Sequence, residues 1–140
     1  NISLFCLGAS EYIFYGYLKS FFTIKKGWAL AIKWLGSISA VAVMGIALTP
    51  VDTMPDLHRY TVTVWIISFL ITVTLITFCS FKRWVRTAHK GLDLAVAMMT
   101  ALHLLSFIIP TPLAWMVVIQ KCEIYLLILW FSINVYAVKR

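Results

Sequence analysis

Residues 60–81 read YTVTVWIISFLITVTLITFCSF, a run of about 22 residues without a charged side chain. A helix of this length rises about 33 Å, which is enough to cross a hydrocarbon core of about 30 Å. Four further apolar runs of similar length occupy residues 2–22, 28–49, 91–109 and 113–137. The sequence therefore predicts an all-α fold: a polytopic membrane helix bundle with five transmembrane helices, forming one domain over residues 1–140.

The composition agrees with a membrane bundle. Hydrophobic residues make up 62% of the chain and charged residues only 12%, whereas a soluble domain carries about a quarter charged residues. The net charge of +7 does not indicate nucleic-acid binding, because the basic residues gather at the ends of the apolar runs. The expected partner is the lipid bilayer, with other membrane subunits as a further possibility, and not nucleic acid.

The basic residues also predict an orientation. They follow the first and third apolar runs and end the chain: Lys25, Lys26, Lys82, Arg83, Arg86, Lys90, Lys139 and Arg140. The positive-inside rule places these segments in the cytoplasm and Asn1 outside a cell membrane. A chain that starts outside without a signal peptide predicts one more span before Asn1, which makes these five of six helices. A five-span protein is the alternative.

Small residues in the second predicted helix indicate close packing. Gly36 and Ala40 form a small-x-x-x-small pair, which lets two helix backbones approach each other. We expect the helix over residues 28–49 to be central or closely packed.

A set of polar residues lies inside the predicted helices: Glu11, His103, Gln120, Lys121 and Glu123. The ionisable members lie about 9–15 Å from the outer ends of their helices, so they can share one layer. Lys121 and Glu123 point about 200° apart, so at least one needs a partner on another helix. We expect a Glu11–Lys121 pair with His103 and Glu123 nearby. This layer is either a polar lock that fixes helix register, or a site for a substrate, a lipid headgroup or a proton.

The outer connection between the second and third helices holds a second candidate site. Asp52, Asp56 and His58 offer oxygen and nitrogen ligands within a short stretch, which suits a divalent ion or acid–base chemistry. The alternative is structural, because Asp forms turns beside Pro and Asp56 can cap the next helix.

Cofactor and catalytic motifs are not expected. His89 and His103 have the spacing of paired haem ligands on one helix, but His58, the remaining histidine, lies in an outer loop and cannot face them. No nucleotide-binding loop, hydrolase elbow or zinc-protease motif occurs in the sequence. The sequence therefore predicts no cofactor and no metal, and it favours a protein without catalysis over an enzyme.

Two stretches resemble a known family. They are GIALTPVDTMPDLH at residues 45–58 and QKCEIYLLILW at residues 120–130. They are similar to a family of six-span prokaryotic membrane proteins of unknown function, numbered 998 among such domains and distantly similar to the Frag/DRAM/Sfk membrane proteins. The resemblance implies that this chain contains the second to sixth helices of that family. The resemblance also implies an Arg at the position where this chain has Lys121. Lys lacks the planar guanidinium group of Arg, so it cannot bind a partner with two parallel hydrogen bonds.

Two functional hypotheses follow. The first is a non-catalytic accessory or lipid-interacting subunit of a membrane complex. The second is a membrane-embedded enzyme or transporter that uses the intramembrane layer of Glu, His and Lys. A water-accessible cavity at that layer favours the second hypothesis, and a dry, fully paired layer favours the first.

Overall fold

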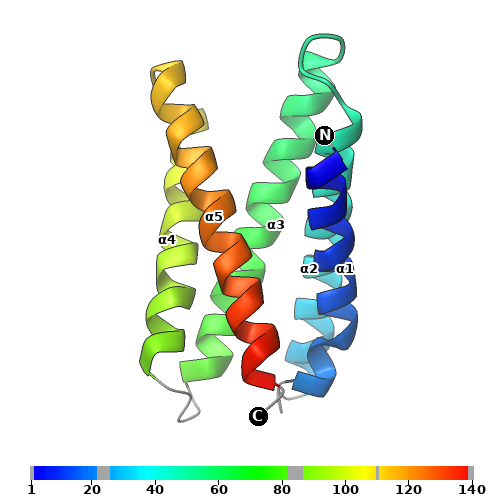
Figure 1. The fold of residues 1–140 in the computed structure, drawn as a ribbon, viewed down its shortest axis with the longest axis vertical. Coiled ribbons are helices and arrows are strands. Elements are labelled where there is room, and N and C mark those ends of the chain that lie inside the picture. Colours follow the sequence, from blue (N-terminus) through cyan, green and yellow to red (C-terminus); the bar gives the residue numbers. More distant parts are fainter. Residues whose placement is uncertain (1, 22–25, 82–86, 110, 139–140) are drawn as a thin grey trace. The chain divides into compact units, whose positions relative to one another are not determined.

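The part of the chain that the structure describes consists of α-helices and their short connections. The structure is a computed structural model, and it describes residues 2–21, 26–81, 87–109 and 111–138. Within these residues Figure 1 shows five helices: α1 (Ile2–Phe21), α2 (Lys26–Leu48), α3 (Pro55–Phe81), α4 (Thr87–Ile108) and α5 (Leu113–Val138). The predicted all-α helix bundle is confirmed.

Four segments of these helices are long and apolar enough to cross a membrane. They are Gly27–Leu48, Pro55–Cys79, Lys90–Ile108 and Ala114–Asn134. Each has 19 to 25 residues, and about 20 apolar residues cross the hydrocarbon core. By the length and composition of its helices, the chain is a multi-pass membrane protein. The further span predicted over residues 2–22 stays a prediction.

The predicted orientation of the helices also stays a prediction. Several of the basic residues on which it depends lie outside the described residues: Lys25, Lys82, Arg83, Arg86, Lys139 and Arg140.

The helices form two compact units, and each is described by itself. The first unit, Asn1–Thr72, holds α1, α2 and most of α3. The second unit, Val73–Arg140, holds the end of α3 together with α4 and α5. The single bundle predicted over residues 1–140 stays a prediction.

In the first unit, α1 and α2 pack directly against each other through small residues. A Cβ atom at Gly36 would lie 2.4–2.5 Å from three ring carbons of Tyr15, so glycine is required there. A Cβ atom at Gly8 of α1 would lie 2.8 Å from the carbonyl oxygen of Ala40. Gly36 and Ala40 are both buried. The close packing predicted for the second helix is therefore confirmed, and its partner is α1.

The helix α3 begins at Pro55, earlier than the predicted start at residue 60. Proline suits the first helical position, because its φ is already helical and its missing N–H would have no partner there. Asp56 follows in the first turn, where the helix dipole favours a carboxylate. Asp56 and His58, expected in the outer connection, therefore belong to α3, and only Asp52 lies between α2 and α3.

In the second unit, α4 and α5 meet along a polar seam. The buried residues of α4 recur every three or four positions, which places them on one face. They are Asp93, Val96, Thr100, His103 and Ser106. The buried residues of α5 follow the same spacing: Glu123, Leu127 and Trp130. We call these eight residues the α4–α5 seam. Polar side chains dominate the α4 half of it, which is unusual for a helix that can cross a membrane.

Candidate functional site

One residue of the predicted outer-connection site, His58, forms a hydrogen bond between the start of α3 and the end of α2. His58 lies 2.6 Å through Nδ1 from the carbonyl oxygen of Thr49, at the end of α2. A carbonyl oxygen only accepts, so Nδ1 carries the hydrogen and donates it. The Thr49 hydroxyl in turn donates to the carbonyl oxygen of Gly45 at 2.9 Å. Asp52 and Asp56 are exposed. The hydrogen bond of His58 therefore links the start of α3 to the end of α2.

A metal site does not form at this place in the described part of the chain. Among residues 2–21, 26–81, 87–109 and 111–138, no three His, Cys, Asp or Glu side chains come together in a group that could hold a metal ion. The loop geometry instead agrees with the structural alternative, in which Asp and Pro residues shape the turn.

The first unit contains one fully buried carboxylate. Glu11 of α1 has no exposed surface, and Ser39 of α2 donates a long hydrogen bond of 3.4 Å from Oγ to its Oε2 atom. One turn further along α1, the Tyr15 ring packs over Gly36. Glu11 is therefore buried in the first unit, and its observed hydrogen-bond partner is a hydroxyl on the adjacent helix.

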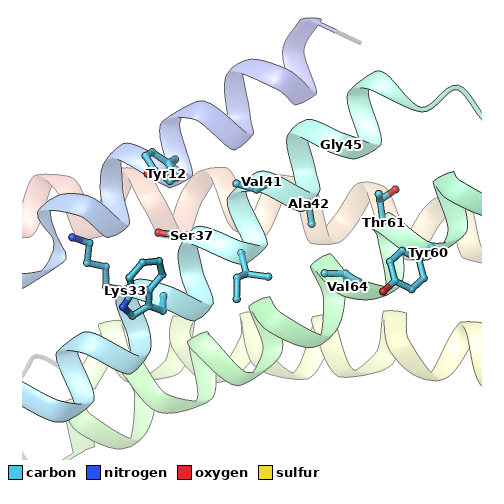
Figure 2. A pocket seen from close by; sticks show the side chains of 11 residues that line it. Tyr12, Lys33, Ser37, Val41, Ala42, Gly45, Tyr60, Thr61 and Val64 are labelled. Atoms are coloured by element: carbon cyan, nitrogen blue, oxygen red, sulfur yellow. The ribbon is translucent and has the colours of Figure 1, made fainter.

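A groove of about 640 Å³ lies on the same unit, lined by α1, α2 and the start of α3. Figure 2 shows Lys33 at one end, Tyr60 and Thr61 at the other, and apolar side chains such as Val41 between them. Along α2 the lining runs from Lys33 to Gly45, or about 18 Å at 1.5 Å per residue. The groove is therefore long, mainly apolar and positively charged at one end.

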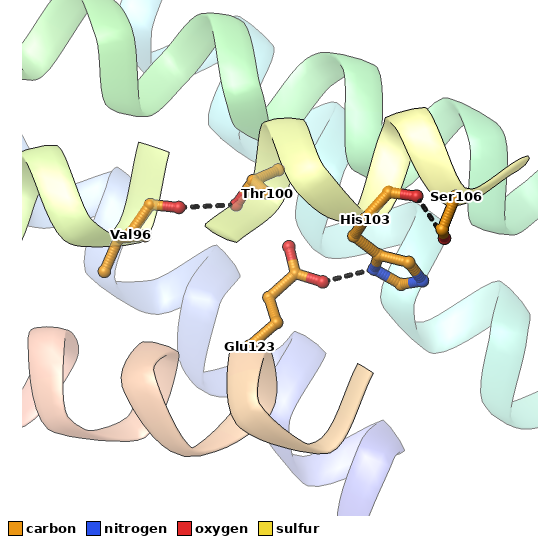
Figure 3. A network of polar contacts seen from close by, with 5 residues as sticks. All are labelled: Val96, Thr100, His103, Ser106 and Glu123. Carbon is orange, nitrogen blue, oxygen red and sulfur yellow. Dashed lines mark hydrogen bonds and ion pairs between the residues drawn. The ribbon is translucent and has the colours of Figure 1, made fainter. Parts of the chain in front are cut away.

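The second unit brings together two members of the predicted polar layer. His103 of α4 and Glu123 of α5 form a buried contact between Nδ1 and Oε2, drawn in Figure 3. The side chains are 3% and 1% exposed, so water does not screen them. The other carboxylate oxygen, Oε1, is buried and has no hydrogen-bond partner among the described residues. The pair is therefore enclosed, and it leaves one buried carboxylate oxygen without a partner among the described residues.

The hydroxyl groups beside this pair are satisfied by their own helix. Ser106 donates from Oγ to the carbonyl oxygen of His103 at 2.7 Å, and Thr100 donates to that of Val96 at 3.0 Å. Such bonds to the preceding turn let a hydroxyl lie at membrane depth without a partner on another helix.

The seam contains a polar contact that the sequence analysis missed. Trp130 of α5 donates from its indole Nε1 to Oδ1 of Asp93 on α4 at 2.6 Å, and both side chains are buried. Residue 93 falls in the first turn of the helix predicted from residue 91, whereas α4 begins at Thr87. The sequence does contain a signal for this contact. Asp93, Thr100 and His103 are separated by seven and three residues, which places them on one face of a helix.

The remaining members of the predicted layer lie on other faces of α5. Lys121 is exposed and Gln120 is partly buried, so Lys121 and Glu123 point in different directions, as the 200° separation predicted. Glu11 belongs to the first unit and Lys121 to the second, and the pair expected between them stays a prediction. The side chain of His89, weighed as a haem ligand, lies outside the described part of the chain.

No protein-family model, curated protein or solved structure matches this chain. The resemblance to the six-span family therefore stays a prediction, and the function has to be argued from the groove and the polar contacts themselves.

Proposed function

We propose that this chain is a non-catalytic membrane subunit that binds an anionic phospholipid in the groove of its first unit. One acyl chain lies along the groove between Lys33 and Gly45, and the phosphate group pairs with the Lys33 ammonium group. The single observation that carries the proposal is an apolar groove of about 640 Å³ with one lysine at its end.

The dimensions of the groove fit one lipid chain. Its volume falls within the range of about 300–1,000 Å³ that is typical of ligand sites. Its length along α2, about 18 Å, is close to the roughly 15 Å thickness of one hydrocarbon leaflet. A second cavity, of about 620 Å³ beside Met98 and Leu102, is lined by apolar side chains alone and offers nothing to a headgroup.

The charge at the end of the groove favours an anionic lipid. Lys33 is exposed and has no ion-pair partner among the described residues. It lies about 10 Å along α2 from Lys26, and helical side chains lean toward the start of their helix, so its ammonium group extends toward the membrane surface. The sequence predicts Lys25 and Lys26 at that surface, and such basic clusters attract anionic headgroups.

The buried polar groups support a role without catalysis. Glu11, Asp93 and Glu123 each accept a hydrogen bond or ion pair from a neighbouring helix within their own unit. Contacts of this kind hold helices together in a membrane, each contributing about 0.6 kcal/mol on average. They give each of these buried carboxyl groups a partner within the protein, so no substrate is needed to explain why it lies there.

The proposal predicts that Lys33→Met weakens binding of phosphatidylglycerol about tenfold. A hydrogen bond to a charged group contributes about 1.5–3 kcal/mol, and 1.4 kcal/mol is a factor of ten. Binding is measured on the purified chain in detergent by native mass spectrometry, with phosphatidylcholine of the same chain length as the comparison lipid. Val41→Trp, which fills the groove, is expected to weaken binding of both lipids.

The controls lie on the second unit. Lys121→Met removes an exposed lysine and Val118→Trp adds an exposed indole on α5, and neither residue lines the groove. Neither is expected to change the affinity for phosphatidylglycerol. If Lys33→Met and Lys121→Met weaken binding equally, the lipid responds to net charge alone and the groove is not its site.

A second candidate function is favoured by the free Oε1 atom of Glu123. The Glu123 carboxyl group contacts His103 through one oxygen, and its other oxygen has no partner in the described part of the chain, which leaves that oxygen able to take up a proton. The seam then acts as a proton-binding site of a transporter. The other titratable groups of the seam are His103, which contacts Glu123, and Asp93, which accepts a hydrogen bond from the Trp130 indole. Lys121 lies on another face of α5.

The proton-binding function is tested by infrared difference spectroscopy between acidic and alkaline samples. We expect a protonated-carboxyl band that Glu123→Gln removes and that Asp56→Asn, at an exposed carboxylate, leaves in place. A spectrum in which Glu123→Gln changes no band would exclude proton uptake at this residue and leave the pair as a structural contact.

A further inference from the structure

The outward face of α5 is unusually exposed for a helix in a packed membrane bundle. Only 17% of the spanning segment Ala114–Asn134 is buried, compared with 44% of Gly27–Leu48 and 44% of Pro55–Cys79. An exposed helix in a membrane is normally uniform and apolar on the side that meets lipid. This face is not uniform, because polar side chains interrupt it.

Six of the exposed residues of α5 share one side of the helix. They are Val118, Lys121, Cys122, Tyr125, Leu129 and Ser132. Intervals of three and four residues place them on one stripe of the helix. We call this set the α5 outer stripe. It lies on a different side of the helix from Glu123, Leu127 and Trp130, which face α4.

Two residues of the α5 outer stripe need polar partners that the described residues do not supply. Lys121 forms no ion pair and Tyr125 no hydrogen bond in the described part of the chain, and Tyr125 is 71% exposed. Lys121 lies about 12 Å along the helix from Leu113, and Tyr125 about 18 Å. A lysine near a helix end can reach the headgroups, but Tyr125 lies near the middle of the spanning segment Ala114–Asn134. Lipid chains offer neither group a hydrogen bond.

We propose that the α5 outer stripe binds a transmembrane helix of another protein, and that this helix carries an Asp or Glu at the depth of Lys121. The carboxylate pairs with the Lys121 ammonium group, and Tyr125 donates its hydroxyl proton to the same helix one turn deeper. Charged residues inside membranes pair in this way, because an isolated charge facing lipid is strongly disfavoured. This interaction is independent of the lipid groove.

A second copy of the chain fits this stripe poorly. If α5 packed against α5 of a two-fold partner, the two Lys121 side chains would lie at the same depth and repel each other. The buried carboxylates of a second copy are engaged elsewhere, Glu11 with Ser39, Asp93 with Trp130 and Glu123 with His103. The acidic residue that complements Lys121 therefore belongs to a different protein.

The proposal can be tested by cross-linking through Cys122, which is exposed beside Lys121. The full chain is prepared with Cys6→Ser and Cys79→Ser, which leaves Cys122 as its single cysteine. It is reconstituted in phosphatidylcholine vesicles with a synthetic leucine–alanine transmembrane peptide. The peptide carries one aspartate about 12 Å from its end and a cysteine next to it. A matched peptide carries asparagine in place of the aspartate.

After oxidation we expect at least tenfold more disulfide-linked product with the aspartate peptide than with the asparagine peptide. Lys121→Met is expected to remove this preference and Lys121→Arg to retain it, which separates charge pairing from any effect on folding. Tyr125→Phe is expected to lower the yield without changing the preference.

Three results would overturn the proposal. Equal yields with both peptides would mean that the stripe meets lipid alone. A Cys122–Cys122 product in the absence of peptide would identify a second copy as the partner. A preference for the aspartate peptide that appears only in a Glu11→Gln background would show that Lys121 pairs with Glu11 of the same chain, as the sequence first suggested.

Discussion

Gly36→Leu is expected to prevent stable packing of α1 against α2, lowering the free energy of unfolding by about 3 kcal/mol, the upper end of the usual range for overpacking. A Cβ atom at this position would lie 2.4–2.5 Å from three carbon atoms of the Tyr15 ring, closer than real Cβ atoms come to a neighbour. Tyr15 cannot move aside easily, because its side chain has no exposed surface and packs edge-on against Phe14 with ring centroids 5.3 Å apart. The leucine therefore has to separate the two helices.

The measurement is unfolding of the purified chain in detergent micelles, followed by circular dichroism. Gly36→Ala is expected to destabilise less than Gly36→Leu, since it adds one carbon instead of four. Gly27→Leu is the matched control on the same helix, because a Cβ atom there meets nothing within 4 Å. That change is expected to be neutral or to stabilise by up to about 1 kcal/mol through helix propensity. Wild-type stability in Gly36→Leu would contradict the described packing.

Trp130→Ala is expected to cause a comparable loss in the second unit, about 3–5 kcal/mol, the range for large aromatic side chains removed from a core. Trp130 has no exposed surface, and its indole donates a 2.6 Å hydrogen bond to Asp93. The alanine leaves a cavity and also takes a donor from a buried carboxylate. Both effects act on the contact between α4 and α5.

Further substitutions separate the two effects. Trp130→Phe keeps most of the ring and loses the N–H donor, so its expected loss is about 1–2 kcal/mol, near the upper end for a hydrogen bond between membrane helices. Trp115→Ala is the control on the same helix, where the side chain is 63% exposed and a change within about 0.5 kcal/mol is expected. The same unfolding measurement applies. Equal losses for Trp130→Ala and Trp115→Ala would refute a structural role for the seam.

The helices could be predicted from the sequence because the bilayer imposes their length. A long apolar run that crosses a bilayer has to form a helix, because only a helix satisfies its backbone hydrogen bonds internally. Most of the predicted helix ends lie within a few residues of the observed ones. The largest error was the start of α3, where Pro55 was taken as the end of a loop although proline also suits the first turn of a helix.

The polar contacts were only partly predictable. His103 and Glu123 stood out because ionisable residues are rare in apolar runs, and they do meet. Asp93 was overlooked because it lies in the first turn of the helix predicted from residue 91, where a carboxylate is expected at the interface. In the structure α4 begins at Thr87, and Asp93 is buried. The groove could not be predicted, because it depends on which faces of α1, α2 and α3 meet, and the apolar pattern of these helices is too uniform to specify that.

Polar contacts among the described residues join helices that follow each other in the chain: Ser39 with Glu11, His58 with Thr49, His103 with Glu123, and Trp130 with Asp93. This has a consequence for biogenesis. A ribosome delivers α4 and α5 in succession, so the charges of α4 find their partners as soon as the next helix leaves the insertion channel. Each pair of helices can then enter the lipid as a hairpin with its polar groups already satisfied.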